Sequence, residues 1–223
     1  MPRHCSPSAS GEKTIKPNDL SESIITAVVH SKLNEVSVDI AEIGLDTFLD
    51  EGVLREVPLI GSIVNIVRSG FSIRDKLFIR KLCTFLIPLS NIPEQEKEKF
   101  AGKLDTDPKL KRKVGDNLIL LLDRLDDLEK PQFLADAFKA YIRGDISYED
   151  FRRLSSAIDI AFIDDLGTLT SVKEHASYDL LHRLTRAGLA ETARSTPTTF
   201  GETDIGVVLS ELGRLYIRVL GAR

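Results

Sequence analysis

The side chains with the clearest potential for chemistry are His175, Asp179 and His182. Positions i, i+4 and i+7 lie on one face of a helix, so two imidazoles and a carboxylate could converge on a metal ion there. Arg186 continues the same face and would repel a cation. Leucines at 180, 181 and 184 mark the buried side of this helix. We therefore interpret the histidine face as a solvated polar face and expect no metal.

Two other patterns resemble sites and fail on their chemistry. Residues 144–151 resemble the end of a calcium-binding loop, but Lys139 and Arg143 then occupy positions that need oxygen ligands. The acidic run at 123–127 fits the outer face of a helix that must be polar. The chain has no glycine-rich phosphate loop, no G-x-S-x-G elbow and no H-E-x-x-H motif. We expect neither enzymatic activity nor a cofactor.

Composition is typical of a globular protein with one or two domains. The chain has 223 residues, of which 42% are hydrophobic and 29% charged, with a formal net charge of −4. That charge provides no general attraction to nucleic acid or anionic membrane. Cys5 and Cys83 are the only cysteines and cannot form a disulfide framework. The first residues lack a signal-peptide core, and no long uncharged apolar run occurs. We expect a cytoplasmic protein.

Charge is uneven along the chain. Residues 64–113 carry 12 Lys and Arg against 6 Asp and Glu, and residues 114–165 carry 6 against 12. These blocks could pair inside the fold or face a partner. Pairing within the fold, together with solvated helix faces, is the simpler interpretation.

Hydrophobic periodicity predicts a mainly α fold in which a multi-helix N-terminal domain precedes a small α+β unit. Residues 1–18 are rich in Ser, Pro, Lys and Gly, which is typical of a disordered tail. Residues 19–147 have helical periodicity throughout and form the predicted helical domain. Residues 148–223 form the second unit, where strand-like alternation first appears near residue 190.

Capping residues predict where several helices begin and end. Ser72-x-x-Asp75 and Ser147-x-x-Asp150 are capping boxes for two helix starts. Asp107 and Pro108 start another helix, whose apolar stripe from Val114 to Leu128 is expected to continue until Pro131. Gly144 is expected to end the helix that follows.

The segment 57–89 contains two strongly apolar helical stretches with interspersed cations. It can be a hairpin of the helical core, a partner-binding surface, or an element that enters a membrane interface. Eleven residues at 57–67 suit a buried helix better than a membrane span. The candidate membrane or partner face comprises Ile60, Ile63, Val64, Val67, Arg68 and Arg74.

The C-terminal third resembles a winged-helix module. The phrase Leu-x-x-Leu-x-x-x-Gly-Leu, followed by Leu-Ser-Glu-Leu-Gly-Arg-x-Tyr, is similar to the end of many bacterial winged-helix regulators. The resemblance implies a first helix at 151–162, a second at 171–176 and a third at 177–188. It also implies strands at 189–194 and 205–209 around a wing at 195–204, and a closing helix at 210–220. The helical remainder resembles short uncharacterised bacterial proteins and suggests no function.

In DNA-binding members of that class the third helix enters the major groove, which implies contacts from Arg183, Arg186 and Arg194. Residues 174–223 contain six Arg, no Lys and six Asp and Glu, so their net charge is zero. Phosphate contacts supply most of the affinity of such proteins, and a neutral unit predicts weak DNA binding. Winged helices also dock other proteins, and the charge balance favours that use.

We therefore expect a non-enzymatic regulatory or adaptor protein that docks a protein partner, with DNA binding through the winged unit as a weak secondary activity. The alternative is a membrane-active effector that uses the helices at 53–89 in peripheral contact with a bilayer. The sequence does not predict whether the chain forms a homo-oligomer.

Overall fold

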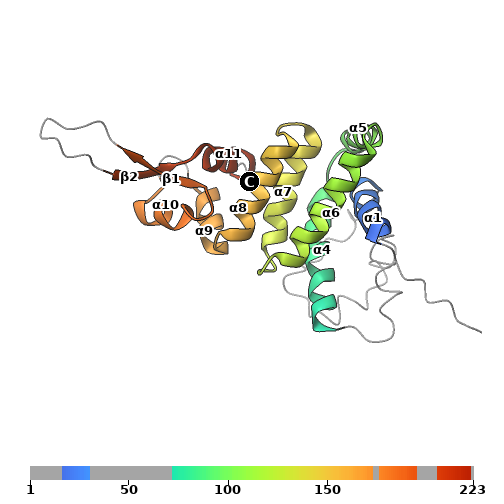
Figure 1. Cartoon of the computed structure of the whole chain (residues 1–223), viewed down its shortest axis with the longest axis horizontal. Helices are drawn as coiled ribbons and strands as arrows, with labels where there is room; N and C mark the ends of the chain where they lie inside the picture. Colours follow the sequence, from blue (N-terminus) through green and yellow to red (C-terminus); the bar gives the residue numbers. More distant parts are fainter. Residues whose placement is uncertain (1–16, 31–71, 173–175, 195–204, 222–223) are drawn as a thin grey trace, which may run out of the picture.

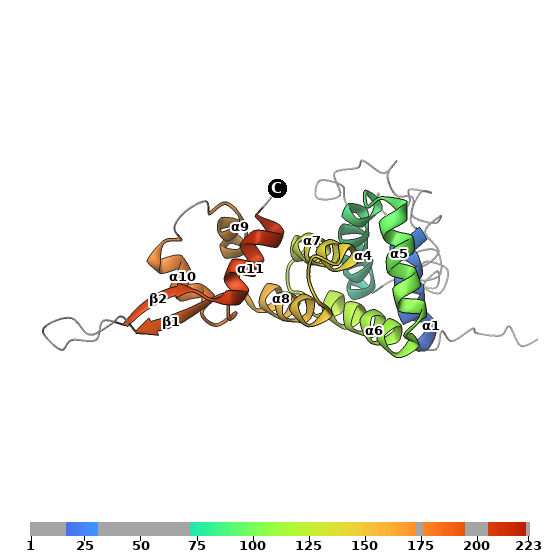
Figure 2. The same cartoon turned by 90° about the horizontal axis from the view of Figure 1, so that it is seen from above.

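The computed structural model describes residues 17–30, 72–172, 176–194 and 205–221. This part of the chain is mainly helical with one two-stranded sheet, which confirms the predicted mainly α class. The helical body and the C-terminal unit lie at opposite ends of an elongated molecule (Figures 1 and 2). The body contains α1 (Pro17–His30), α4 (Ile73–Ser90), α5 (Glu94–Asp105), α6 (Pro108–Arg124) and α7 (Lys130–Arg143). Next come α8 (Tyr148–Ile160), α9 (Ile163–Thr170), α10 (Tyr178–Leu184), β1 (Ala190–Arg194), β2 (Ile205–Leu209) and α11 (Glu211–Leu220).

The predicted helix caps are present. Ser72 starts α4 and Ser147 starts α8 with complete capping boxes, in which each serine side chain accepts a hydrogen bond from the aspartate backbone three residues later. Asp107 caps α6 by accepting a 3.0 Å hydrogen bond from the Leu110 backbone. Gly144 ends α7 in the left-handed region with φ 82°, which glycine adopts without steric cost.

The helix that starts at Pro108 ends earlier than its apolar stripe predicts. It stops at Arg124, and Pro131 belongs to the first turn of α7. Polar contacts stabilise this end of α6. The Lys81 Nζ donates hydrogen bonds to the carbonyls of Asp123 and Leu125. The buried Lys130 Nζ lies 2.7 Å from the Asp126 carboxylate and 2.9 Å from the Asp159 carbonyl.

Other boundaries also differ from the predictions. Helix α9, which was not predicted, begins directly after Phe162, with Asp164 and Asp165 in its first turn. Half of the predicted second helix at 171–176, namely residues 173–175, lies outside the described residues. The first helix of the unit ends at Ile160, and α10 spans fewer residues than the predicted 177–188. At the other end of the chain α1 begins at Pro17, inside the predicted tail, whereas residues 1–16 lie outside the described residues.

Aromatic rings form the centre of the hydrophobic core around α7. Phe138 lies between Phe85 of α4, Phe100 of α5 and Phe151 of α8, with ring centroids 5.1 to 5.8 Å apart. Tyr141 stacks on Phe151 at 5.8 Å. The buried cluster continues without interruption into α9, α10 and α11.

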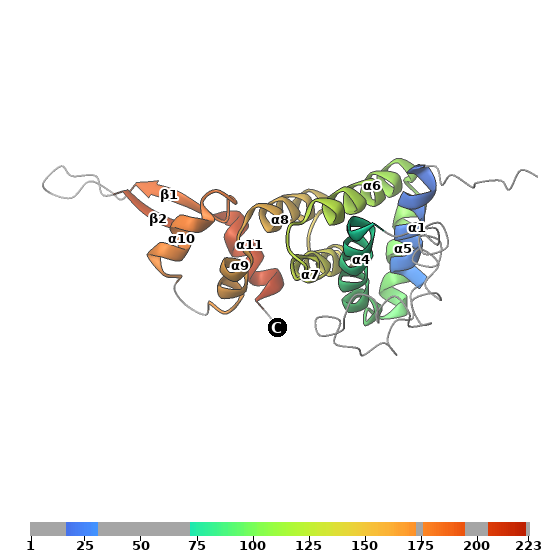
Figure 3. The same ribbon diagram turned by 90° about the horizontal axis from the view of Figure 1, so that it is seen from below.

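The C-terminal unit contains the elements in the predicted order. Strand β1 pairs antiparallel with β2, so that Ala190 faces Leu209 and Arg194 faces Ile205. Helix α11 closes the unit and packs against α7 and α9 (Figure 3). The Tyr216 hydroxyl donates a 3.2 Å hydrogen bond to the Leu166 carbonyl, which fixes α11 on α9. The predicted wing at 195–204 lies outside the described residues.

Within the described ranges no helix is both long and apolar enough to cross a bilayer. The longest of the described helices, α4, has 18 residues and packs its buried side against the other helices of the body.

Candidate partner-binding groove and arginine surface

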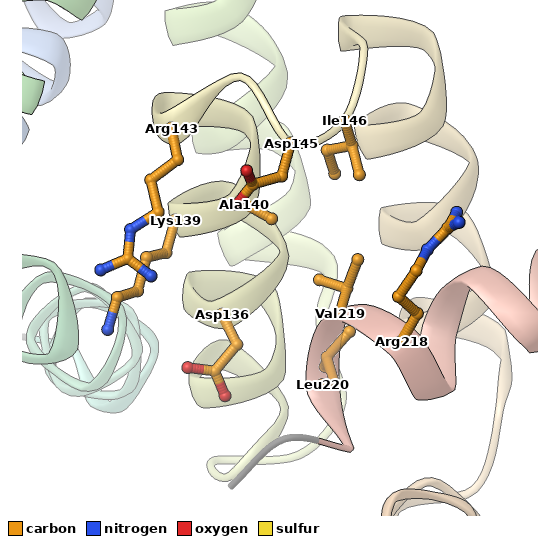
Figure 4. Close-up of a pocket in the computed structure, with 9 residues that line it drawn as sticks. All are labelled: Asp136, Lys139, Ala140, Arg143, Asp145, Ile146, Arg218, Val219 and Leu220. Atoms are coloured by element: carbon orange, nitrogen blue, oxygen red, sulfur yellow. The ribbon is translucent and has the colours of Figure 1, made fainter.

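A groove of about 590 Å³ opens where α7 of the helical body meets the end of α11 (Figure 4). Its size falls in the range typical of ligand and peptide sites, roughly 300 to 1,000 Å³. The helical body and the C-terminal unit each supply part of the wall. The lining residues are Asp136, Lys139, Ala140, Arg143, Asp145, Ile146, Arg218, Val219 and Leu220.

One wall of the groove is a single side of α7. Positions 136, 139, 140 and 143 are spaced by three or four residues and therefore lie on one side of α7. Phe138 and Tyr141 of the same helix are buried in the aromatic core, which fixes the orientation of α7. The opposite wall is the last turn of α11, held in place by the buried Tyr216 and Leu220.

The groove combines an apolar centre with charges of both signs. Ala140, Ile146 and Val219 lie around its middle, and acidic and basic side chains surround them (Figure 4). The Arg143 Nε lies 3.0 Å from a Glu96 carboxylate oxygen on α5, which holds that guanidinium toward the helical body. The described lining residues include no His, Cys, Ser or Thr. The groove therefore offers shape, apolar surface and charge for binding.

Arg183, the first predicted DNA contact, is engaged within the protein. Its guanidinium makes a bidentate contact with the Asp165 carboxylate, with Nη2 2.8 Å from Oδ1 and Nε 3.1 Å from Oδ2. Asp165 is buried, with only 8% of its side chain exposed. Hydrogen bonding to this carboxylate raises the pKa of the Arg183 guanidinium. The arginine fork thus joins α10 to α9 instead of projecting freely toward a phosphate.

The other candidate residues of this unit lie in different local settings. Arg186 is exposed in the turn after α10, one helical turn beyond Arg183. Arg194 occupies the last position of β1. His182 is exposed beside the Tyr178 ring at a centroid distance of 6.1 Å, and His175 lies outside the described residues. Nowhere in the described part do three or more potential metal ligands form a group.

The candidate membrane face falls mostly outside the described residues, which include neither Ile60, Ile63, Val64 and Val67 nor Arg68. Arg74 lies in the first turn of α4, and its guanidinium is 2.7 Å from the Asp123 carboxylate of α6. The second half of the 57–89 segment is therefore α4, whose side chains from Ile79 to Leu89 contribute to the core.

Sequence patterns did not reveal the groove. The apolar stripe of α7 indicates which side of that helix is buried, but only tertiary packing brings Arg218 and Val219 to the opposite side. Their spacing from Lys139 is about 80 residues, and neither segment contains a binding motif.

Searches of protein-family models, curated proteins and solved structures found no match to the chain.

Proposed function

We propose that this protein is a non-enzymatic adaptor or regulatory protein, and that the groove between α7 and α11 holds a segment of its protein partner. One observation carries the proposal: a groove of about 590 Å³ has an apolar centre between Ala140 and Val219 and charges of both signs around it. Protein interfaces have this composition, with an apolar middle and a polar rim. A phosphate backbone would instead require a surface dominated by cations.

The contacts of Arg183 favour a protein over DNA as the partner. Arg183 has its bidentate hydrogen-bonding capacity directed at the buried Asp165. Asp179 and Glu191 add negative charge to α10 and β1. We retain the resemblance of α8 to α11 to a winged-helix module as part of the proposal, with protein docking as the use of that module.

The test starts with quantitative affinity capture on the full chain from its native host cell. Lys139→Glu and Arg218→Glu change opposite walls of the groove. Arg214→Glu is the matched control, because it makes the same charge change one turn earlier on the exposed side of α11. The expected partner is recovered with the wild-type chain and the control, and is lost with both groove variants.

Binding of that partner is then measured with purified proteins. We expect each groove variant to raise the Kd at least tenfold, with the Arg214→Glu variant close to wild type. A partner that binds all four chains equally, or no reproducible partner at all, would refute the groove as the docking site. Circular dichroism of each variant checks that the fold is intact.

A gel-shift assay tests the DNA activity separately. We expect a weak shift of duplex DNA at low salt that disappears near physiological ionic strength, because few phosphate contacts are available. Arg186→Glu should weaken this shift further, whereas Arg218→Glu should not. Tight binding at physiological salt would favour DNA over protein as the partner.

A further inference from the structure

A second groove, of about 490 Å³, lies between the start of α7 and one side of α9. Glu129 and Phe133 line it from the start of α7. The lining residues from α9 and its end are spaced by three or four positions and therefore share one side of that helix. They are Ile163, Asp164, Gly167, Thr168 and Ser171. We call this site the acidic groove.

The charged side chains that line the acidic groove are carboxylates. Glu129 and Asp164 supply them, and neither forms an ion pair with a described residue. Asp127 adds a third negative charge, because its carboxylate accepts a 2.7 Å hydrogen bond from the Glu129 backbone. The adjacent cation, Lys130, is buried and paired with Asp126. The N-termini of α7 and α9 each offset only about half a unit of charge, so the groove stays negative.

The acidic groove also has an open position halfway along α9. A Cβ at Gly167 would meet no described atom within 4 Å. Glycine inside a helix costs about 1 kcal/mol relative to alanine, and close packing among the described residues does not explain it here. The missing side chain leaves space beside Phe133 and Ile163, the two apolar residues of the lining.

The hollow of about 260 Å³ between α4 and α6 lacks this combination. Its one cation, Arg74, is paired with Asp123 at 2.7 Å, and Asp75 belongs to the capping box of α4. The carboxylates of the acidic groove differ, because they have no cation of their own among the described residues. They are therefore available to the cations of a partner.

The charge and the apolar surface together indicate the chemistry of that partner. Negative charge repels nucleic acid and anionic lipid. No group of three or more potential metal ligands occurs among the described residues. Phe162, directly before Ile163, is 64% exposed, so apolar surface continues at the start of α9. A protein segment with both cationic and apolar side chains complements this combination.

We propose that the acidic groove binds a cationic, amphipathic segment of a partner protein. Lys or Arg side chains of that segment reach Glu129 and Asp164, and an apolar side chain between them lies over Gly167 against Phe133. The proposal goes beyond the proposed function, since none of these residues lines the groove between α7 and α11.

Selection from a displayed library of random peptides on the full chain tests the proposal. Peptides that also bind the combined Glu129→Gln and Asp164→Asn variant are removed, so that the remaining peptides depend on the two carboxylates. We expect the remaining peptides to be enriched in both Lys or Arg and large apolar residues. Glu149→Gln combined with Glu211→Gln is the matched control, because it removes two exposed carboxylates from the first turns of α8 and α11.

A second pair of variants separates binding in the groove from simple charge attraction. Gly167→Leu fills the open position and leaves every charge in place, and we expect it to raise the Kd of the selected peptides about tenfold or more in fluorescence anisotropy. Gly102→Leu is its control, because Gly102 lies in α5 and a Cβ there also meets no described atom within 4 Å. This control should bind the peptides like wild type.

Any of three results would overturn the proposal. The first is that no peptide prefers the wild type to the Glu129→Gln and Asp164→Asn variant. The second is that the preferred peptides lack an excess of Lys and Arg or of apolar residues. The third is that Gly167→Leu binds the peptides as tightly as Gly102→Leu, which would reduce the interaction to unspecific charge attraction. Thermal denaturation of each variant separates loss of binding from loss of folding.

Discussion

Aromatic rings pack around α7 at the centre of the molecule, whereas the C-terminal unit relies on close backbone approaches and polar ties. Phe138 contacts rings from α4, α5 and α8 at the centre. In the unit, by contrast, Gly213 packs directly on the Leu189 carbonyl and Ser210 connects two segments. The first arrangement depends on side-chain volume, and the second depends on backbone geometry. Different kinds of substitution should therefore damage the two regions.

The largest effect is expected from removing a central ring. Phe138→Ala deletes a fully buried side chain and leaves a cavity bounded by three helices, which should lower the free energy of unfolding by about 3–5 kcal/mol. Urea denaturation followed by circular dichroism measures the loss. Tyr178→Ala, at an aromatic position that is 59% exposed, should change stability by about 0.5 kcal/mol or less. Similar losses for both variants would contradict the central role of the ring cluster.

The next largest effect is expected at a glycine of the C-terminal unit that lies against the backbone of another segment. A Cβ at position 213 would collide with the Leu189 carbonyl oxygen, so Gly213→Ala should cost about 1–3 kcal/mol. At Gly167 in α9 a Cβ meets no atom within 4 Å. Gly167→Ala should therefore stabilise the chain, by up to about 1 kcal/mol, through higher helix propensity. Replacing glycine by alanine should therefore lower the free energy of unfolding at position 213 and raise it at position 167. A change in the same direction at both positions in urea denaturation would disprove the close approach at Gly213.

A third comparison uses two helix caps. Ser210 Oγ accepts a 3.0 Å hydrogen bond from the Gly213 backbone and donates a 2.6 Å hydrogen bond to the Gly188 carbonyl. Ser147 Oγ caps the more exposed start of α8. Ser147→Ala should cost about 1 kcal/mol, and Ser210→Ala should cost about 2 kcal/mol because a partly buried carbonyl also loses its donor. Equal losses would indicate that the tie to Gly188 contributes little.

The same contrast explains how much of the structure the sequence could predict. Capping boxes at Ser72 and Ser147 and the glycine at 144 predicted helix ends correctly, because those signals act within four residues. The end of α6 was predicted wrongly, since Lys81 stabilises it from 42 residues away. The short helix α9 was not predicted, because eight residues carry too little periodicity to locate a helix.

The candidate surfaces were harder to predict than the elements. The sequence indicated Arg183 as a candidate DNA or partner contact, but its binding to Asp165 depends on how α9 and α10 pack. The groove between α7 and α11 and the hollow between α4 and α6 each combine residues from two segments distant in sequence. Local patterns report which side of a helix is buried, and they contain no information on which helix covers it.

The effect that is smallest at neutral pH concerns a polar atom inside the aromatic centre. The Tyr141 hydroxyl is buried, and no described residue forms a hydrogen bond with it. Burial raises the pKa of Tyr141 from 10.0 to about 12. In the unfolded chain the hydroxyl ionises at its ordinary pKa. Between about pH 10 and pH 12 it therefore loses its proton in the unfolded state and keeps it in the folded state. The contribution of Tyr141 to stability is therefore complete below pH 10 and is lost as the pH rises through 12.

Tyr141→Phe isolates this contribution, because it removes the ionising group and keeps the ring in the cluster. At neutral pH the variant should match or slightly exceed wild-type stability, since the lost hydroxyl has no described partner to leave unsatisfied. Above pH 10 the wild type should lose stability faster than the variant in chemical denaturation. Tyr148, whose pKa is also raised by burial, remains in both chains, so the difference between them reports on Tyr141 together with its repulsion from Tyr148. A stability difference that stays constant from pH 7 to pH 12 would show that water reaches the Tyr141 hydroxyl, and that the aromatic centre is less closed than its ring packing indicates.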